Sequence, residues 1–324
     1  MKAAVLRGPG EVPVYADFDD PQVPEGYELV EIVAAGIHPV VRSIATGRHY
    51  GSTGTWPLVP GVDAVARTAG GALIYTGFVR PPHGTLAERA AVPASMQLSL
   101  PPGTAPERVA AGMNPGMSSW LPLRQRQDET GALGTVLILG ATGMAGLLAV
   151  QNAYALGASR VIAAGRNPGA LDRAAGFGAT AVAVGEDRDA TAAALAGALA
   201  GDAPGLVLDF VWGPPAEAAF AALGRRGLGE DHADISYVQI GAVAGPEAAV
   251  PSALLRSRHI RMTGSGAGSA SMAVIRAEIP VYLGLIADGR IDVPVRTFPL
   301  PAIGDAWLAA AGSGNRAVVL PNAV

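Results

Sequence analysis

The chain has 324 residues, of which 50% are apolar and 15% are charged, and its net charge is −4. This length is enough for two domains of ordinary size, and the apolar fraction excludes a disordered chain. The weak negative charge, with no basic tract, argues against binding to nucleic acid or to an anionic membrane through bulk electrostatics.

Cysteine is absent, which excludes disulfides, thiolate zinc sites, cysteine nucleophiles and iron–sulfur clusters. No two of the five histidines have the i, i+4 spacing of a helical metal site, and there is no HExxH motif. A site built from His38, His49 and Asp63 is the one metal arrangement that the residues still allow. We expect no metal.

No apolar run reaches the length of a membrane span, and residues 1–10 lack the long apolar segment of a signal peptide. We therefore expect a cytoplasmic protein with no membrane insertion.

Residues 1–100 contain short apolar stretches separated by glycine and proline turns, a pattern typical of an all-β or barrel-like region. Residues 106–124 have the composition of a helix. The sequence Asn114-Pro115-Gly116 predicts that this helix is broken.

From Leu133 onward, apolar strands alternate with alanine-rich helices. This alternation predicts a parallel, doubly wound sheet with helices on both faces. The predicted strands are 135–140, 160–165, 181–185, 206–212, 237–243 and 260–265. A helix interrupted at Pro280 then leads to a short β-rich tail, which is too small to fold alone and is expected to return to the first domain.

The stretch Thr135–Gly146 joins a strand to a helix through three glycines. This arrangement holds the pyrophosphate of a dinucleotide. Gly140 permits the tight turn, Gly143 lets the backbone approach the phosphates, and Gly146 lets helix and strand pack closely. The predicted pyrophosphate loop is Gly140, Ala141, Thr142, Gly143, Met144, Ala145 and Gly146.

The next strand ends in Gly165-Arg166-Asn167, where NAD-binding folds usually carry an acidic residue for the ribose 2′-hydroxyl. An arginine suits a 2′-phosphate, so the sequence predicts NADPH. Val211 and Gly213 follow the fourth strand, at the carboxyl edge where ligands sit in such sheets. Because glycine is abundant, the triplet alone would also fit an ordinary turn; the order of the elements favours a nucleotide site.

Nearly end to end, the chain resembles a medium-chain dehydrogenase/reductase of the zinc-free quinone oxidoreductase branch. The opening MKAAVLRGPG resembles that family's first strand, Pro82–Glu88 its GT-ap-AE element, and Asn114–Trp120 the hinge before its nucleotide domain. GATGMAG resembles its AxxGxxG loop, and Tyr237–Ala242 its strand beneath the nicotinamide.

The resemblance implies an α/β fold with a GroES-like β-barrel catalytic domain (1–117) and a Rossmann domain (118–270), followed by a returning C-terminal segment (271–324). It implies that Asn114 and Ser118 lie on the wall opposite the nicotinamide and ribose. The residues implied near those two groups are Ile240, Gly241, Ala242, Gly264, Ser265 and Gly266. It also implies a homodimer through the edge strand Ile260–Thr263, the alternative being a capped, monomeric edge.

Zinc alcohol dehydrogenases carry a Gly-His-Glu signature where this chain has Pro60-Gly61-Val62-Asp63, and a cysteine near the position of Gly36-Ile37-His38. The resemblance and the residue chemistry therefore both imply that no zinc is bound. Many quinone oxidoreductases also have an Asn and an Asp in the segment that here reads 38–43, and neither is present.

With neither metal nor thiol, the expected chemistry is hydride transfer from NADPH to a quinone or an α,β-unsaturated carbonyl compound. The acceptor oxygen gains negative charge and needs a hydrogen-bond donor. Tyr50 is the first candidate, or else a buried aromatic ring lining the cleft; His38 is the second, or else a structural histidine before a proline. Arg42 and His49 are candidates to orient the substrate, or else face solvent, and Asp63 is expected to make a structural hydrogen bond.

Two alternatives stay open. One is a zinc-free alcohol/ketone oxidoreductase, which the missing Lewis acid disfavours. The other is a non-catalytic NADPH-binding redox sensor, which the missing Asn and Asp favour. The sequence does not name the natural substrate.

Overall fold

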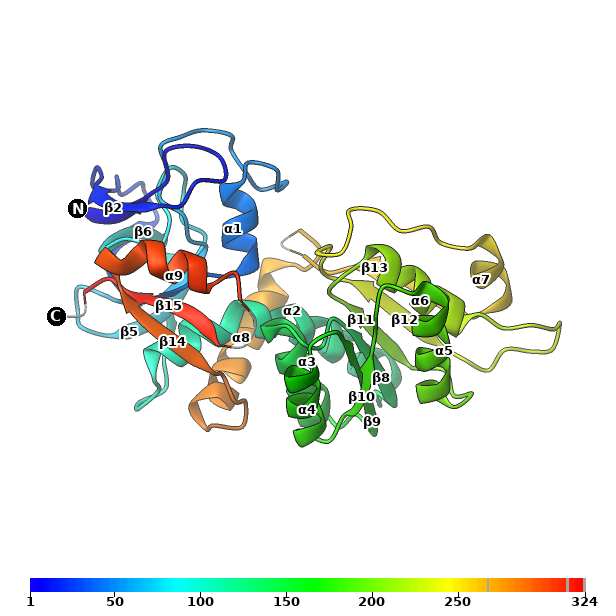
Figure 1. Ribbon diagram of the computed structural model, residues 1–324. Coiled ribbons are helices and arrows are strands. Elements are labelled where there is room, and N and C mark those ends of the chain that lie inside the picture. The colour runs from blue at the N-terminus through cyan, green and yellow to red at the C-terminus, as the bar shows by residue number, and fades with distance from the viewer. Residues whose placement is uncertain (267, 313–314, 323–324) are drawn as a thin grey trace. The chain divides into compact units, whose positions relative to one another are not determined.

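The computed structural model describes residues 1–266, 268–312 and 315–322, and the chain divides into two compact units. Unit 1 comprises Met1–Pro115 and Arg276–Val324, and unit 2 comprises Gly116–Ile275. The boundaries fall at residues 115 and 275, where the sequence predicted 117 and 270. Unit 2 is one stretch of chain, whereas unit 1 is assembled from both ends of it (Figure 1).

Unit 2 is built on a six-stranded sheet with the order β10-β9-β8-β11-β12-β13, in which every neighbouring pair is parallel. Its strands are Thr135–Leu139 (β8), Arg160–Gly165 (β9), Thr180–Ala183 (β10), Leu206–Asp209 (β11), Ile235–Gln239 (β12) and Ile260–Gly264 (β13). The predicted doubly wound parallel sheet is therefore confirmed.

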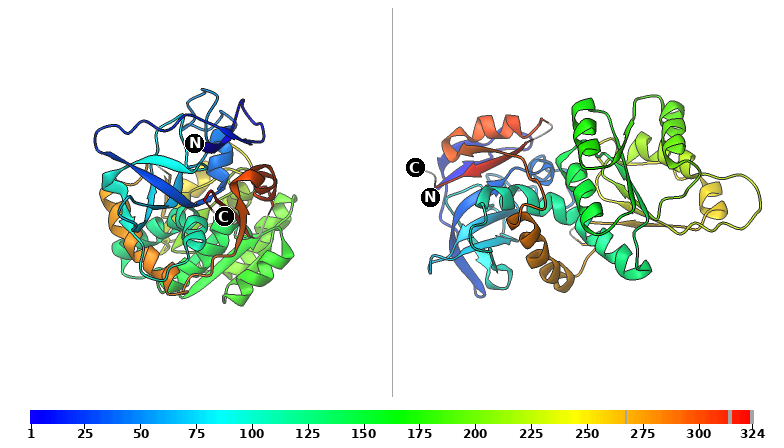
Figure 2. Two further views of the ribbon diagram at one scale, coloured as in Figure 1. Left: turned by 90° about the vertical axis from the view of Figure 1, so that its left-hand side faces the viewer. Right: turned by 90° about the horizontal axis from the view of Figure 1, so that it is seen from below.

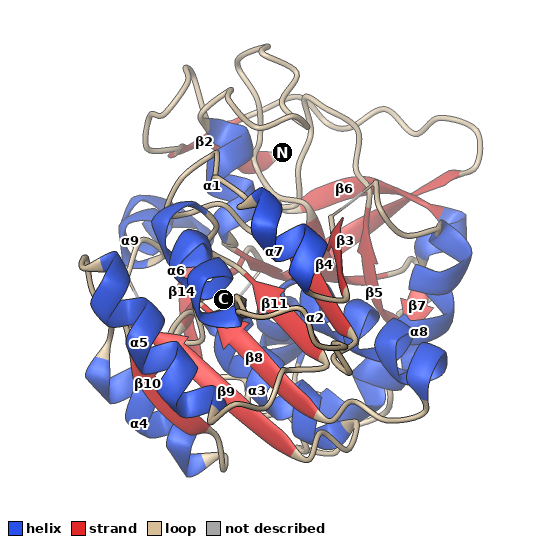
Figure 3. Ribbon diagram, turned by 90° about the vertical axis from the view of Figure 1, so that its right-hand side faces the viewer, coloured by secondary structure: helices blue, strands red, loops and turns tan. Residues whose placement is uncertain are grey.

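Alternate residues of β8 face two different apolar clusters, because successive side chains of a strand point to opposite faces. Val136 and Ile138 pack with one layer of helices, and Leu137 and Leu139 with another. The first layer is α2 (Pro106–Thr130), α3 (Met144–Ala155) and α4 (Pro168–Gly176); the second is α5 (Arg188–Leu199), α6 (Gly213–Leu223) and α7 (Ser252–Ser257). Figure 3 shows helices on both sides of these strands.

The predicted break at Asn114-Pro115-Gly116 is wrong, because α2 runs without interruption from Pro106 to Thr130. A proline inside a helix removes one backbone hydrogen bond. Burial outweighs that loss, since the helix buries apolar side chains both before and after the proline. These are Val109, Ala110, Ala111, Met113, Met117, Trp120 and Leu123.

Unit 1 contains a seven-stranded sheet with the order β14-β15-β3-β4-β5-β7, and β6 also pairs with β3. Its strands are Tyr27–Gly36 (β3), Asp63–Arg67 (β4), Leu73–Gly77 (β5), Arg89–Pro93 (β6), Leu98–Ser99 (β7), Val295–Pro299 (β14) and Arg316–Leu320 (β15). All its pairs except β14–β15 are antiparallel. A separate hairpin pairs Lys2–Val5 (β1) with Val14–Asp17 (β2). The predicted combination of a β-rich domain with a Rossmann domain is confirmed.

The C-terminal strands lie beside N-terminal ones, as the red and blue segments of Figure 2 show. Unit 1 contains helices α1 (Pro39–Ala45) and α9 (Ile303–Ala309) and the first part of α2, with 3-10 turns at Ala94–Met96 and Leu300–Ala302; most of α8 (Met272–Ala287) also belongs to it. Helix α8 continues through Pro280, so the predicted interruption there is wrong. The buried face after the proline again sustains the helix.

Within the described ranges, none of the helices combines the length and the apolar character that crossing a membrane requires.

Candidate functional site

The carboxyl ends of five parallel strands form one row in unit 2. Asp209 lies opposite both Leu139 and Gln239; Leu139 lies opposite Ala164, and Gln239 opposite Gly264. The predicted cofactor residues from 140 to 146, 165 to 167, 211 to 213, 240 to 242 and 264 to 266 lie at or directly after this row. The structure therefore brings these five segments to one edge of the sheet.

Each glycine of the glycine loop meets a different steric requirement. Gly140 has φ +85°, which glycine adopts without strain. A Cβ on Gly146 would lie 2.3 Å from the carbonyl oxygen of Gly140 and 2.5 Å from Cα of Ala141. A Cβ on Gly143 would have no neighbour nearer than 3.8 Å, so there the open space faces away from the protein. Helix α3 begins at Met144 with no side-chain cap, which leaves the N–H groups of its first turn available to an anion.

Arg166 lies next to this loop, at the end of β9. A Cβ on Gly165 would lie 2.3 Å from Cγ2 of Thr142, so the two segments are packed against one another. Arg166 is exposed, and no hydrogen bond or ion pair joins it to another described residue. Asn167 caps α4, since its Oδ1 accepts a hydrogen bond from the N–H of Ala170 at 2.9 Å. Arg166 is therefore an exposed cation without a partner among the described residues, and the residue before it packs on the glycine loop.

The third and fourth segments interlock. Gly213 has φ +60°, and a Cβ there would lie 3.0 Å from the backbone of Ala244. A Cβ on Gly241 would lie 2.4 Å from the carbonyl oxygen of Phe210. The N–H of Ala244 donates a hydrogen bond to the carbonyl of Val211 at 2.8 Å. The segment after β11 and the segment after β12 are therefore packed so closely that a shift of one requires a shift of the other.

Asp209, which sequence reasoning missed, lies between these segments and is fully buried. Its Oδ1 accepts hydrogen bonds from the N–H groups of Val211 (2.8 Å) and Trp212 (2.9 Å), and its Oδ2 accepts one from the Tyr237 hydroxyl (2.6 Å). Burial raises the pKa of Asp209, and these three hydrogen bonds oppose that rise. In the sequence, Asp209 could have been found as a carboxylate that ends an apolar strand just before Gly213.

The last predicted segment follows β13. The N–H of Ser265 donates to the carbonyl of Gln239 at 2.8 Å, and Gly266 is held in a turn by the hydroxyl of Ser269. Gly264 and Ser265 line a cavity of about 140 Å³ that also extends along α2, β12 and β13. The glycine loop does not line this cavity. Ile240 is half-buried and Ala242 is exposed after β12.

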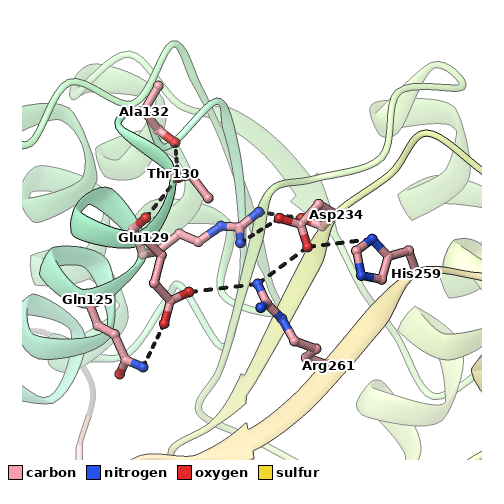
Figure 4. A network of polar contacts seen from close by, with 8 residues as sticks. Gln125, Glu129, Thr130, Ala132, Asp234, His259 and Arg261 are labelled. Carbon is pink, nitrogen blue, oxygen red and sulfur yellow. Dashed lines mark hydrogen bonds and ion pairs between the residues drawn. The ribbon is translucent and has the colours of Figure 1, made fainter.

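A polar network joins α2 to the amino ends of β12 and β13 (Figure 4). Arg126 is buried and binds Oδ2 of Asp234 at 3.0 Å. Arg261 lies 3.3 Å from Asp234 and 3.7 Å from Glu129, and His259 lies 3.8 Å from Asp234. The network lies away from the row of strand ends, and we assign it to holding α2 on the edge of the sheet.

Asn114 and Ser118 both lie on α2, one turn apart and each half-buried. Residues four apart on a helix share a face.

A second polar cluster is buried in unit 1. His38 is fully buried before Pro39 in an extended conformation (φ −86°, ψ 159°), and its Nε2 lies 3.2 Å from Oδ1 of Asp63. This is an ion-pair contact whose angles are not those of a hydrogen bond. The Tyr75 hydroxyl donates to Oδ2 of Asp63 at 2.8 Å, which confirms the structural hydrogen bond expected of Asp63. Arg316 is buried nearby, and burial lowers its pKa to about 10 against the opposing charge of Asp63.

Three other candidates of unit 1 lie elsewhere. Tyr50 is 78% exposed, so its interpretation as a buried ring is wrong; it stacks on the His49 ring, with 4.1 Å between centroids. Partial burial lowers the pKa of His49. Arg42 lies on α1 and is half-buried, so the interpretation as a solvent-facing loop residue is wrong. It donates a hydrogen bond to the carbonyl of Trp307 and lies over that ring, and so ties α1 to α9.

Among residues 1–266, 268–312 and 315–322, no three His, Cys, Asp or Glu side chains are grouped closely enough to hold a metal ion. His49 does not join His38 and Asp63, since Nδ1 of His49 accepts the N–H of Gly51 in an exposed loop.

Comparisons with known proteins agree with this architecture. No protein-family model matches the chain. The chain is 27% identical, over 95% of its length and 96% of the other protein, to the probable NADPH-dependent quinone reductase tdiC of Emericella nidulans. It is 29% identical, over 88% of its length and 68% of the other protein, to the probable zinc-binding alcohol dehydrogenase Rv1895 of Mycobacterium tuberculosis.

Among solved structures, the quinone oxidoreductase of Thermus thermophilus, which is also known in complex with NADPH, covers 99% of this chain with 28% identity and a TM-score of 0.80. A mycobacterial quinone oxidoreductase covers the same share at 22% identity, with a TM-score of 0.80, which shows a shared fold. In sequence and in fold, the chain is thus similar to quinone oxidoreductases of the medium-chain dehydrogenase/reductase superfamily.

Proposed function

We propose that this protein is an NADPH-dependent, metal-independent oxidoreductase that reduces quinones or α,β-unsaturated carbonyl compounds by hydride transfer. One observation carries the proposal: an uncapped helix N-terminus and an exposed arginine follow two adjacent strands at the carboxyl edge of a parallel sheet. The quinone reductases among its relatives support the reaction class.

The residues at this edge fit NADPH. The N–H groups of the first turn of α3 suit a pyrophosphate, and Gly143 offers open space for its approach. Arg166 has no competing partner among the described residues and suits the 2′-phosphate as a charged hydrogen-bond donor. When bound, NADPH supplies a hydride, so a quinone needs one further proton to become a hydroquinone.

For that proton, we propose His38 rather than Tyr50. His38 is shielded from bulk water, and its Nε2 lies 3.2 Å from Oδ1 of the Asp63 carboxylate, which fixes the orientation of the ring. The Tyr50 hydroxyl lies on an exposed loop, where water competes for it.

A zinc ion does not fit the residues of this cluster, although one relative is named as zinc-binding. The chain has no cysteine, and Val62 stands where a histidine ligand would be needed. Asp63 already serves His38 and Tyr75, and the charge of Arg316 lies near it. These residues support a reaction without a metal.

We expect Arg166→Ala to abolish the preference for NADPH over NADH. Losing a charged hydrogen bond to the 2′-phosphate costs about 1.5–3 kcal/mol, or roughly ten- to a hundredfold in NADPH affinity, and leaves NADH affinity unchanged. Fluorescence titration with both nucleotides measures this, followed by nucleotide oxidation with a panel of quinones and enones. Arg256→Ala, on the exposed part of α7 in the same unit, is the matched control.

A wild-type protein that binds neither nucleotide would end the proposal. Tight NADPH binding without oxidation by any acceptor would instead favour a redox sensor. That alternative rests on the absence of Asn and Asp from residues 38–43.

We further propose a cytoplasmic homodimer that pairs through β13. This strand is the last of the sheet, and Arg261 and Thr263 on it are exposed. An uncovered edge offers free N–H and C=O groups to a second copy. We expect Thr263→Lys to yield monomers in analytical ultracentrifugation, because a two-fold axis brings the two added charges together. Ala253→Lys on exposed α7 should leave the dimer intact; an unchanged dimer in Thr263→Lys would place the interface elsewhere.

A further inference from the structure

Trp212 has a backbone conformation that is unusual for its residue type. Its φ is 55° and its ψ is −163°, a region that glycine occupies readily and other residues avoid. Its ring packs edge-on against Phe220 (centroids 5.9 Å apart) and Tyr237 (6.4 Å). Such a conformation persists only where the surroundings impose it.

The carboxylate of Asp209 imposes it. The N–H groups of Val211 and Trp212 point at the same oxygen, Oδ1, which fixes the peptide between them. The Tyr237 hydroxyl holds the other carboxylate oxygen, so the carboxylate itself cannot turn. Because Asp209 is fully buried, removing its side chain leaves these three buried donors without their acceptor in the protein.

The segment that is held in this way contacts both of its neighbours at the row of strand ends. A Cβ on Gly140 would lie 2.7 Å from Cγ1 of Val211 and 3.3 Å from Cβ of Phe210, so residues 210 and 211 press on the start of the glycine loop. The main-chain carbonyl of Asp209 accepts the N–H groups of residues 240 and 241, at 2.7 and 3.1 Å. A shift of Trp212 therefore displaces the glycine loop and the segment after β12.

We propose that Asp209 is a positioning residue for the cofactor: it locks Trp212 in the left-handed region and thereby sets the segments that bind NADPH. Asp209 touches no substrate in this role and acts through Trp212. The inference rests on the proposed NADPH site.

The test compares Asp209→Ala in the wild-type background with the same change in a Trp212→Gly background. Glycine reaches the left-handed region without help, so the lock is dispensable there. We expect Asp209→Ala to weaken NADPH binding about tenfold, or about 1.4 kcal/mol, in the wild type. Added to Trp212→Gly, it should weaken binding by less than about threefold, because the two sites are coupled.

A kinetic split separates positioning from general damage. Asp209→Ala should raise KM for NADPH about tenfold, while kcat at saturating NADPH and KM for the quinone change by less than about twofold. Asp209→Asn keeps an oxygen for the two N–H groups and should restore most of the affinity. If Asp209→Ala does not fold, Asp209→Leu, which is close in size and has no acceptor oxygen, takes its place in both backgrounds. Equal losses in the two backgrounds would overturn the proposal.

The local lock is also measurable without any nucleotide. The same four proteins, unfolded in urea, should show a smaller loss of stability from Asp209→Ala when residue 212 is glycine. Coupling in urea together with no NADPH binding by the wild type would end the proposed function and the cofactor role, while keeping the lock. NADPH binding with no coupling in either assay would overturn the lock and leave the proposed function standing.

Discussion

Gly146→Ala is expected to abolish NADPH binding and to destabilise unit 2. The added Cβ would lie 2.3 Å from the carbonyl oxygen of Gly140 and 2.5 Å from Cα of Ala141, and both are backbone atoms that have no rotamer to yield. Helix α3 must therefore move away from β8, which costs about 1–3 kcal/mol or more as overpacking. A displacement of about 1 Å at the first turn of α3 would cost roughly a hundredfold in a function that needs exact placement. Urea unfolding and NADPH titration measure the two effects.

Gly143→Ala is the matched control in the same loop. The φ of Gly143 is −83°, and its added Cβ meets nothing nearer than 3.8 Å, so the fold should keep its stability. Any loss of NADPH binding in this variant then reports the approach of the phosphates rather than packing. If Gly146→Ala unfolds at the same urea concentration as the wild type, α3 can move away from β8 without a loss of stability. The packing argument would then be wrong.

Asp63→Asn is expected to cost the largest stability of any change in unit 1. The substitution keeps the shape of the side chain but leaves the buried guanidinium of Arg316 without its nearby negative charge. Breaking a direct buried ion pair costs about 3–5 kcal/mol, because the remaining charge stays desolvated; Asp63 acts on Arg316 without a direct contact, so we expect a loss near the lower end of that range. Burial lowers the pKa of Arg316 only to about 10, so the guanidinium remains charged at neutral pH. The loss of the Asp63 charge therefore destabilises it. The free energy of unfolding in urea measures it.

Tyr75→Phe distinguishes the charge from the hydrogen bond. It removes the hydroxyl that donates to Oδ2 of Asp63 and keeps the carboxylate, so we expect a smaller loss of about 1.5–3 kcal/mol. Equal losses in Tyr75→Phe and Asp63→Asn would mean that the charge of Asp63 contributes little. Arg316 would then be stabilised mainly by its hydrogen bond to the carbonyl of Ile37, at 3.1 Å.

The local features of the fold could be predicted because they depend on neighbours in sequence. The turn at Gly140 and the strand before it are encoded within a dozen residues, and the helix and the strand that ends at Gly165 follow directly after them. The two helices that pass through Pro115 and Pro280 were missed for the opposite reason. Burial along a whole helix face outweighs one lost hydrogen bond, and no local pattern reports that burial.

The tertiary contacts were harder to predict from the sequence, because they join residues far apart in the chain. Arg42 binds the carbonyl of Trp307 at a separation of 265 residues, and no residue close to Arg42 in the sequence indicates that partner. Tyr237 meets Asp209 across 28 residues, through the pairing of β11 with β12. The order of the strands has to be known before such a pair is visible. Tyr50 shows the limit of reading from residue type alone, since an aromatic residue in an apolar chain is still 78% exposed.

The assembly of unit 1 from both ends of the chain has a consequence for the order of folding. Strand β3 is made early, but Ala35 must wait for Val319 of β15 before that side of the sheet is covered. Unit 2 is complete once Ile275 has been synthesised, so it can fold on the ribosome while β3 still exposes an open edge. Closing the sheet then requires a contact across almost the whole sequence, and such contacts form slowly. A nascent chain arrested before residue 316 would carry a finished nucleotide-binding unit attached to an unfinished sheet.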